Sequence, residues 1–166
     1  MDCPKCGVAV ADGSAFCSAC GSPVASGEGK SPSEINRDWL GEVLRRAGYE
    51  VTPAEKDQDA VLAKHAKRMN VVVTVRRGIG LITASSFWST KKGWGQEKAM
   101  LTALNAANAR SWFNTFSVDK DGDVNVSGYI VMANRVSEAD VVKFLERASD
   151  SFFETIKACG LMEFLK

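Results

Sequence analysis

The sequence has no long hydrophobic run, few prolines and a single histidine. Of its 166 residues, four are Pro, two are Tyr and one is His. No segment approaches the ~18 consecutive apolar residues that a membrane-spanning helix needs, so we expect no membrane partner. The N-terminus, Met1 to Lys5, lacks the positive stretch and apolar core of a secretory signal. These absences predict a cytoplasmic protein.

Residue types that commonly carry out catalysis are also scarce. The one histidine, His65, has Lys64, Lys67 and Arg68 as its charged sequence neighbours, not a nucleophile or an acid. The chain contains no nucleophile elbow, and the run Gly78-Ile79-Gly80 is too short to hold a phosphate. We therefore expect that the protein is not an enzyme and that it has no catalytic residues.

Hydrophobic residues make up 45% and charged residues 25% of the chain, which is typical of a globular protein. The formal net charge of +1 hides an uneven distribution. Residues 60–98 carry eight Lys and Arg but only one acid, Glu97, whereas every other part of the chain is slightly acidic. This basic stretch, residues 60–98, predicts a locally positive surface on a nearly neutral protein.

Four of the five cysteines form two Cys-x-x-Cys pairs near the N-terminus, Cys3 with Cys6 and Cys17 with Cys20. Two cysteines at that spacing lie on one tight turn, so that both sulfurs can reach the same ion at about 2.3 Å. A glycine follows each pair and can adopt the positive φ that such a turn needs. Residues 1–22 therefore predict a small domain held by one structural Zn²⁺, because the segment cannot bury a core of its own.

Cysteine pairs serve three other roles in proteins, and each fits this sequence less well. A disulfide framework suits a secreted protein, and no signal is present. A thioredoxin-like redox motif needs only one Cys-x-x-Cys, at a strand-to-helix junction. Catalytic zinc needs an open coordination position, which four thiolates do not leave. The fifth cysteine, Cys159, lies on an apolar helix face and is expected to behave as a small hydrophobic side chain.

The pattern Cys-Pro-x-Cys-Gly, followed by Phe-Cys-x-x-Cys-Gly, resembles the short zinc ribbons at the N-termini of many bacterial proteins. Residues 23–32 are rich in Gly, Pro and Ser and predict a flexible linker. Residues 33–166 are long enough for a core of their own.

In residues 33–166 the hydrophobic pattern predicts a helix, several strands, a second helix, a hairpin and a last helix. This order favours the α+β class, with an antiparallel sheet and helices packed on one face. A first helix is expected to begin at Ser31 or Ser33 and to end at Gly48, and Ser137 to begin the last one with Asp140 in a capping box. The other expected elements are strands at 49–52, 60–65, 70–77 and 81–88, a helix at 96–110, and hairpin strands at 112–118 and 124–132.

Local sequences in this domain resemble the bacterial YbjN family. They are Leu44 to Val51 at the end of the first helix, Leu104 to Asn108 in the second, and Gly122 to Val124 in the hairpin. The resemblance implies a fold like that of type III secretion chaperones and a noncatalytic binding domain, often dimeric. Asn105 and Asn108 share one side of their helix and favour a structural hydrogen-bonding role over a ligand groove.

The basic stretch leaves its partner open. Lys91 and Lys92 lie near Trp88 and Trp94 in the sequence, a mixture of charge and aromatic surface that single-stranded nucleic-acid sites also have. Arg76 and Arg77 complete the candidate partner-binding set. An acidic protein partner and a simple solvated face are the other interpretations. In contrast, Asp119, Asp121 and Asp123 lack the spacing of a calcium loop and predict a hairpin turn.

Together these observations predict a zinc-binding adaptor or chaperone-like protein whose α+β domain binds a protein partner. The wide apolar face of the last helix could also pair two subunits. The alternative is a nucleic-acid- or ribosome-binding regulator that acts through the basic stretch.

Overall fold

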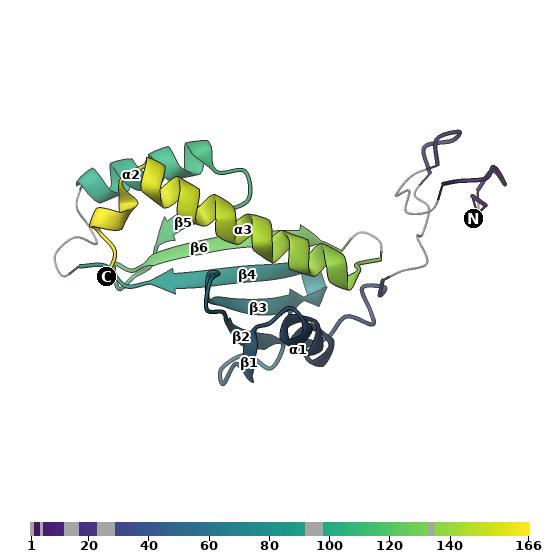
Figure 1. Cartoon of the computed structure of the whole chain (residues 1–166), viewed down its shortest axis with the longest axis horizontal. Helices are drawn as coiled ribbons and strands as arrows, with labels where there is room; N and C mark the ends of the chain where they lie inside the picture. Colours follow the sequence, from purple (N-terminus) through teal and green to yellow (C-terminus); the bar gives the residue numbers. More distant parts are fainter. Residues whose placement is uncertain (1, 4, 12–16, 23–28, 92–97, 133–134) are drawn as a thin grey trace.

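A computed structural model describes residues 2–3, 5–11, 17–22, 29–91, 98–132 and 135–166 of the chain (Figure 1). Its main body is an antiparallel six-stranded sheet with three helices, which confirms the expected α+β class. The helices are α1 (Arg37–Arg46), α2 (Lys98–Arg110) and α3 (Glu138–Ala158). The strands are β1 (Glu50–Pro53), β2 (Ala60–Lys64), β3 (Val71–Arg76), β4 (Leu81–Trp88), β5 (Thr115–Val118) and β6 (Val124–Val131). Two short 3-10 turns, η1 (Arg77–Ile79) and η2 (Leu161–Glu163), complete the elements.

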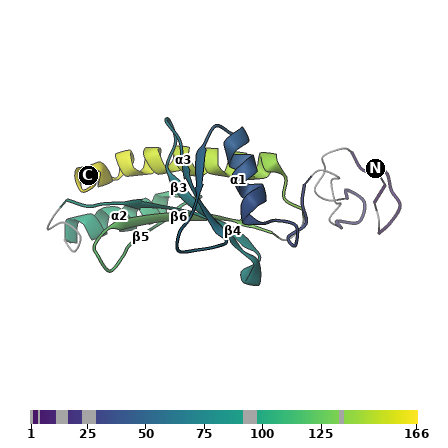
Figure 2. The same ribbon diagram turned by 90° about the horizontal axis from the view of Figure 1, so that it is seen from below.

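The strands lie in the order β1-β2-β3-β4-β6-β5, and every neighbouring pair is antiparallel. The first four strands follow one another as neighbours. Helix α2 then carries the chain past the place beside β4, so that β5 becomes the outermost strand and β6 returns between them. Figure 2 shows α3 running along the sheet. None of the helices in the described segments is long and apolar enough to cross a membrane.

One face of the sheet is covered by all three helices. Val75, Ile82 and Ile130 are register partners on β3, β4 and β6, and all three belong to the main apolar core or pack against it. Phe152 of α3 is fully buried there and stacks on Trp88, with 4.8 Å between ring centroids. Alternate residues such as Tyr129 point to the opposite face and are exposed. The fold therefore places its helices on one face, as expected.

The first helix begins later than the sequence predicts. The Asn36 side chain accepts a hydrogen bond of 2.9 Å from the backbone N–H of Trp39, so α1 begins at Arg37. Ser31 instead forms a separate turn, in which its N–H donates to the Glu34 carboxylate at 2.8 Å. The serine and glutamate thus have the chemistry of a capping box but close a turn that no helix continues.

Other local predictions agree with the structure. Ser137 and Asp140 form the expected capping box at the start of α3. The Asp119 carboxylate accepts the N–H groups of Asp121 and Asp123 at 2.9 and 3.0 Å, so these acids close the β5–β6 hairpin.

Strand β5 is shorter than predicted, because residues 111–114 are tied to the helices. The N–H of Asn114 donates to Ser111 Oγ at 3.0 Å, and its side-chain amide donates to the carbonyl of Ala148 in α3 at 2.8 Å. These bonds take residues 111–114 out of the hydrogen-bonded ladder with β6, which therefore begins only at Thr115. The local sequence does not reveal this constraint, because Ala148 lies in another element.

The bend brings the chain very close to β6 at Gly128. A Cβ atom at this glycine would lie 2.6 Å from the backbone carbonyl oxygen of Phe113 and 3.1 Å from Cζ of Phe144. Residue 128 must therefore be glycine for the segment 111–114 to cross the strand.

We predict that Gly128→Ala destabilises the domain, because the added methyl group displaces a backbone carbonyl. The expected loss in the free energy of unfolding is about 1–3 kcal/mol, measured by urea denaturation. Gly78→Ala is the control, since nothing lies within 4 Å of the Cβ position there. Equal stability of the two variants would show that residues 111–114 are not held against β6.

Candidate metal centre and binding surface

The two cysteine pairs are built as the same turn used twice. The N–H of Gly7 donates to the carbonyl of Cys3 and that of Gly21 to the carbonyl of Cys17, both at 2.8 Å. Gly7 has φ +72° and Gly21 φ +66°, as the sequence predicts for the glycine after each pair. Each turn therefore presents two sulfurs on one side.

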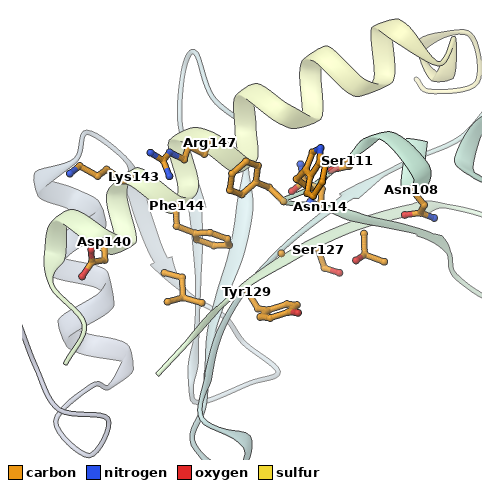
Figure 3. A pocket seen from close by; sticks show the side chains of 14 residues that line it. Asn108, Ser111, Asn114, Ser127, Tyr129, Asp140, Lys143, Phe144 and Arg147 are labelled. Carbon is orange, nitrogen blue, oxygen red and sulfur yellow. The ribbon is translucent and has the colours of Figure 1, made fainter. Parts of the chain in front are cut away.

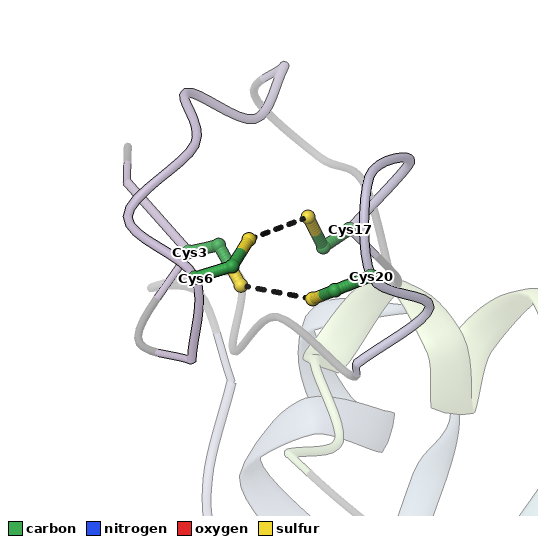
Figure 4. A group of neighbouring side chains, drawn as sticks. All are labelled: Cys3, Cys6, Cys17 and Cys20. Atoms are coloured by element: carbon green, nitrogen blue, oxygen red, sulfur yellow. Dashed lines mark hydrogen bonds between the residues drawn. The ribbon is translucent and has the colours of Figure 1, made fainter.

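The four sulfurs lie together, within 4.8 Å of one another (Figure 4). Cys3 Sγ is 3.6 Å from Cys20 Sγ, and Cys6 Sγ is 3.6 Å from Cys17 Sγ. These distances are too long for disulfides, whereas four thiolates bound to one zinc ion at about 2.3 Å have similar separations. The donor set fits one structural zinc ion in a closed four-sulfur site.

Hydrogen bonds at the site separate the thiols in acidity. The Ser22 hydroxyl and backbone N–H lower the pKa of Cys20 to about 6. At Cys6 the Val8 backbone N–H lowers the pKa, but the neighbouring thiols, Cys20 first, raise it to about 12. Four negative sulfurs this close repel one another unless a cation lies between them. Zinc would supply that cation and hold the two turns together.

A second feature lies at the outer edge of the sheet. There the Asn108 side chain of α2 forms the backbone hydrogen bonds that a neighbouring strand would otherwise form with β5. Its side-chain amide donates to the carbonyl of Phe116 at 2.8 Å, and its Oδ1 accepts the Phe116 N–H at 2.7 Å. Both outward backbone groups of Phe116, in the middle of β5, are thereby paired. The structural role expected for Asn108 is what the structure shows; Asn105 is exposed and forms no hydrogen bond with another described side chain.

The same edge is open farther along β6. Strand β5 pairs with β6 only from Val124 to Ser127, whereas β4 pairs with β6 as far as Val131. Among the described segments, no strand lies beside residues 128–131 on the β5 side. Half of the outer edge is therefore closed by β5 and half is left without a partner strand.

A hollow of about 700 Å³ runs along this open half; we call it the edge hollow (Figure 3). It is lined by residues 127–130 of β6, by Asn108 and residues 111–115, and by four residues of α3. Those four are Asp140, Lys143, Phe144 and Arg147. Since 127–130 includes residues from both faces of the sheet, the hollow lies beside the strand edge and not over one face.

Exposed aromatic side chains gather at this hollow. Trp112 is 94% exposed and Tyr129 is 61% exposed, and both line it together with Phe113. Trp112 and Phe113 also line a second hollow between α2 and α3, so the two side chains form a ridge between two depressions. This surface has no signature in the sequence, because no motif marks Trp112 or Tyr129.

Comparison with known families gives two matches. The profile of the YbjN family, described as "Putative bacterial sensory transduction regulator", matches residues 36–159, which is most of the chain. A zinc-ribbon profile matches residues 3–24. The chain belongs to the YbjN family. Its α+β domain is the YbjN domain, and a zinc ribbon precedes it.

Two solved structures share the fold of this YbjN domain, and a third is less similar. The crystal structure of YbjN from E. coli has a TM-score of 0.59 at 15% identity, covering 78% of this chain and 94% of that one. An uncharacterized protein from Methanothermobacter thermautotrophicus has a TM-score of 0.52 at 9% identity, covering 77% and 99%. The HopA1–SchA chaperone–effector complex contains a chain with a TM-score of 0.47 at 13% identity, covering 72% and 88%. No curated protein matches the chain.

The predicted partner-binding residues of the basic stretch are spread over the YbjN domain. Arg76 and Arg77 lie at the turn between β3 and β4. They form ion pairs with Asp57 and Asp59, at 3.3 and 3.2 Å respectively. Lys91 follows the other end of β4 and donates to the carbonyl of Glu163. The eight residues of β4 separate the two groups by roughly 26 Å.

The remaining predicted residues add little charge or aromatic surface that the structure describes. Trp88 is half-buried and packs on Phe152 in the core. Lys92 and Trp94 lie outside the described residues. Arg68, also in the basic stretch, pairs with Glu146 at 2.5 Å. All three arginines of the stretch thus form ion pairs with acids from elsewhere in the chain.

We predict that Cys17→Ser lowers the zinc content from one ion per chain to none, because three sulfurs cannot close the site. The YbjN domain keeps its fold in this variant, since its core shares no residue with the ribbon. Native mass spectrometry measures the zinc and circular dichroism the fold. Cys159→Ser is the control, because Cys159 is outside the four-cysteine group. Retention of zinc by Cys17→Ser would contradict the four-thiolate site.

We also predict that Asn108→Ala destabilises the domain by about 1–3 kcal/mol, because the Phe116 backbone loses both partners. Thermal and urea unfolding measure the change. Asn105→Ala, on the same helix and exposed, is the matched control and is expected to change stability by less than about 0.5 kcal/mol. A neutral Asn108→Ala would show that the edge of β5 is not held by this amide.

Proposed function

We propose that this YbjN-family protein is a noncatalytic, zinc-containing adaptor that binds a protein partner through its α+β domain in the cytoplasm. The observation that carries the proposal is the gathering of exposed aromatic side chains around the edge hollow. Trp and Tyr are enriched at protein interfaces, since they bury much area at little entropic cost. A surface tryptophan that is 94% exposed buys no stability for the isolated chain.

The ribbon is proposed to supply a second contact or a tethering point. We place it at residues 1–22, joined by the linker 23–32 to the domain 33–166. The end of the linker is held: Lys30 exchanges two backbone hydrogen bonds of 2.9 Å with Val136, just before α3. A partner bound by both modules would gain from their high effective concentration.

Nucleic acid is the weaker candidate partner. The ion pairs of Arg68, Arg76 and Arg77 reduce the free positive charge of the basic stretch. A second copy of the chain stays a further candidate for the domain surface.

Cross-linking in the host bacterium tests the proposal. In the double variant Trp112→Ala/Tyr129→Ala, the yield of cross-linked partner polypeptide is expected to fall at least about ten-fold. The stability of the variant is expected to be unchanged. Ile79→Ala is the matched control, because Ile79 is 70% exposed in η1 and does not line the edge hollow. Identical cross-linked polypeptides from all three proteins would contradict a binding surface at the hollow.

A further inference from the structure

The backbone of β6 determines which of its groups face the open edge. The N–H of Met132 donates to the carbonyl of Gly80, at the entry to β4, at 2.7 Å. In an antiparallel sheet the N–H and C=O of one residue point to the same side, and successive residues alternate. The backbone N–H and C=O groups of Gly128 and Ile130 therefore point toward β4. Those of Tyr129 and Val131 point toward the open edge.

The bonds of β5 agree with this assignment. The backbone N–H and C=O of Phe116 point outward to Asn108. The backbone groups of Thr115 and Ser117 must therefore point toward β6. Their register partners are Ser127 and Asn125, which are in the same alternating set as Tyr129 and Val131. Among the described residues, nothing pairs with the outward groups of Tyr129 and Val131.

The charges along the hollow come from α3. Lys143 and Arg147 are exposed, and no described acid lies within 4.0 Å of either side chain. The third charged residue, Asp140, is already occupied: its carboxylate accepts the N–H and Oγ of Ser137 at 2.9 and 2.8 Å. The helix wall of the hollow therefore offers two cations without acidic partners, while Tyr129 and Val131 are 61% and 57% exposed on the other side of the edge.

We propose that the edge hollow binds an extended segment of another protein, which adds to β6 as an antiparallel strand beyond the end of β5. The proposal rests on the protein-binding function above and names the partner's chemistry. Residues of the segment that face α3 are acidic and meet Lys143 and Arg147. Alternate residues are apolar and pack beside Tyr129 and Val131 on the other face. Backbone hydrogen bonds supply the affinity, and this alternation supplies the specificity.

A defined peptide tests the recognition chemistry. The probe is a fluorescein-labelled eight-residue peptide of alternating Val and Glu, and the control is the same peptide with Lys in place of Glu. Fluorescence anisotropy measures the binding of each peptide to the full-length, zinc-loaded protein. We expect the Val-Glu peptide to bind at least about ten-fold more tightly than the Val-Lys peptide. The double variant Lys143→Glu/Arg147→Glu is expected to reverse that preference. Absence of binding by the Val-Glu peptide, or an unchanged preference in the variant, overturns the proposal.

N-methylated peptides test the strand pairing itself. In antiparallel pairing, the residues opposite Tyr129 and Val131 lie on the same face as these side chains, and their N–H groups point at β6. Methylation of every Val nitrogen is therefore expected to abolish binding, and methylation of every Glu nitrogen to change it less than about three-fold. Equal tolerance of both peptides, or loss only with the Glu set, overturns antiparallel strand addition.

A variant of the protein gives the complementary test. Val131→Pro removes an N–H that faces the open edge and not the β4 ladder, a position that a strand tolerates. This variant is expected to keep its fold and to bind the Val-Glu peptide at least about ten-fold more weakly. Full binding by a folded Val131→Pro overturns the pairing. If the variant does not fold, the N-methylated peptides decide the question.

Other outcomes separate this inference from the proposed function. A dimer in sedimentation that Val131→Pro converts to a monomer would place a second copy at the edge and overturn the proposal. If the Val-Glu peptide fails but cross-linking still depends on Trp112 and Tyr129, the protein-binding function stands and the strand addition falls. If the Val-Glu peptide fails to bind and cross-linking does not depend on Trp112 and Tyr129, both the strand addition and the protein-binding function are overturned.

Discussion

The double hydrogen bond between Asn108 and the backbone of Phe116 determines how the sheet ends. An edge strand exposes a row of unpaired N–H and C=O groups, which proteins commonly cover. Here one side chain of α2 pairs both outward groups of Phe116 and so protects β5. The same contact fixes α2 beside β5, and the chain between them must then bend across Gly128. The bend ends β5 early and leaves the second half of β6 without a neighbour.

The zinc ribbon obeys a different constraint. Its only buried hydrophobic residues are Cys3, Cys17 and Val10 among those described, too few to stabilise a domain by burial. Stability must come from the metal, because four thiolates within 4.8 Å repel one another without it. The ribbon is thus a metal-dependent unit beside a domain with a conventional apolar core, and the two are expected to respond independently to metal removal and to denaturant.

Local chemistry made much of this molecule predictable. The cysteine spacing, the Asp119 turn and the Ser137 capping box each depend on a few neighbouring residues, and β4 has the predicted bounds Leu81–Trp88. Tertiary contacts explain the differences. Ser31 has a capping sequence, yet Asn36 begins the helix. Residues 112–114 are predicted as part of a strand, yet Asn114 is bonded to Ala148.

The binding surface could not be read from the sequence for the same reason. Trp112, Tyr129 and Arg147 are far apart in the chain and come together only because β6, α3 and the segment 111–114 meet. The basic stretch suggested a surface because its cations are close in sequence. In the fold, Asp57, Asp59 and Glu146 pair with three of its arginines, and the acids come from outside the stretch.

Amide hydrogen exchange of the free, zinc-loaded protein, measured residue by residue by NMR, tests the half-open edge most directly. The account predicts slow exchange for the N–H of Phe116, held by Asn108, and of Ile130, paired with β4. It predicts exchange at least about a hundred-fold faster for Tyr129 and Val131, whose N–H groups face the open edge of β6. Equal protection of all four amides would contradict the account, because it would mean that the edge of β6 is already paired in the free protein.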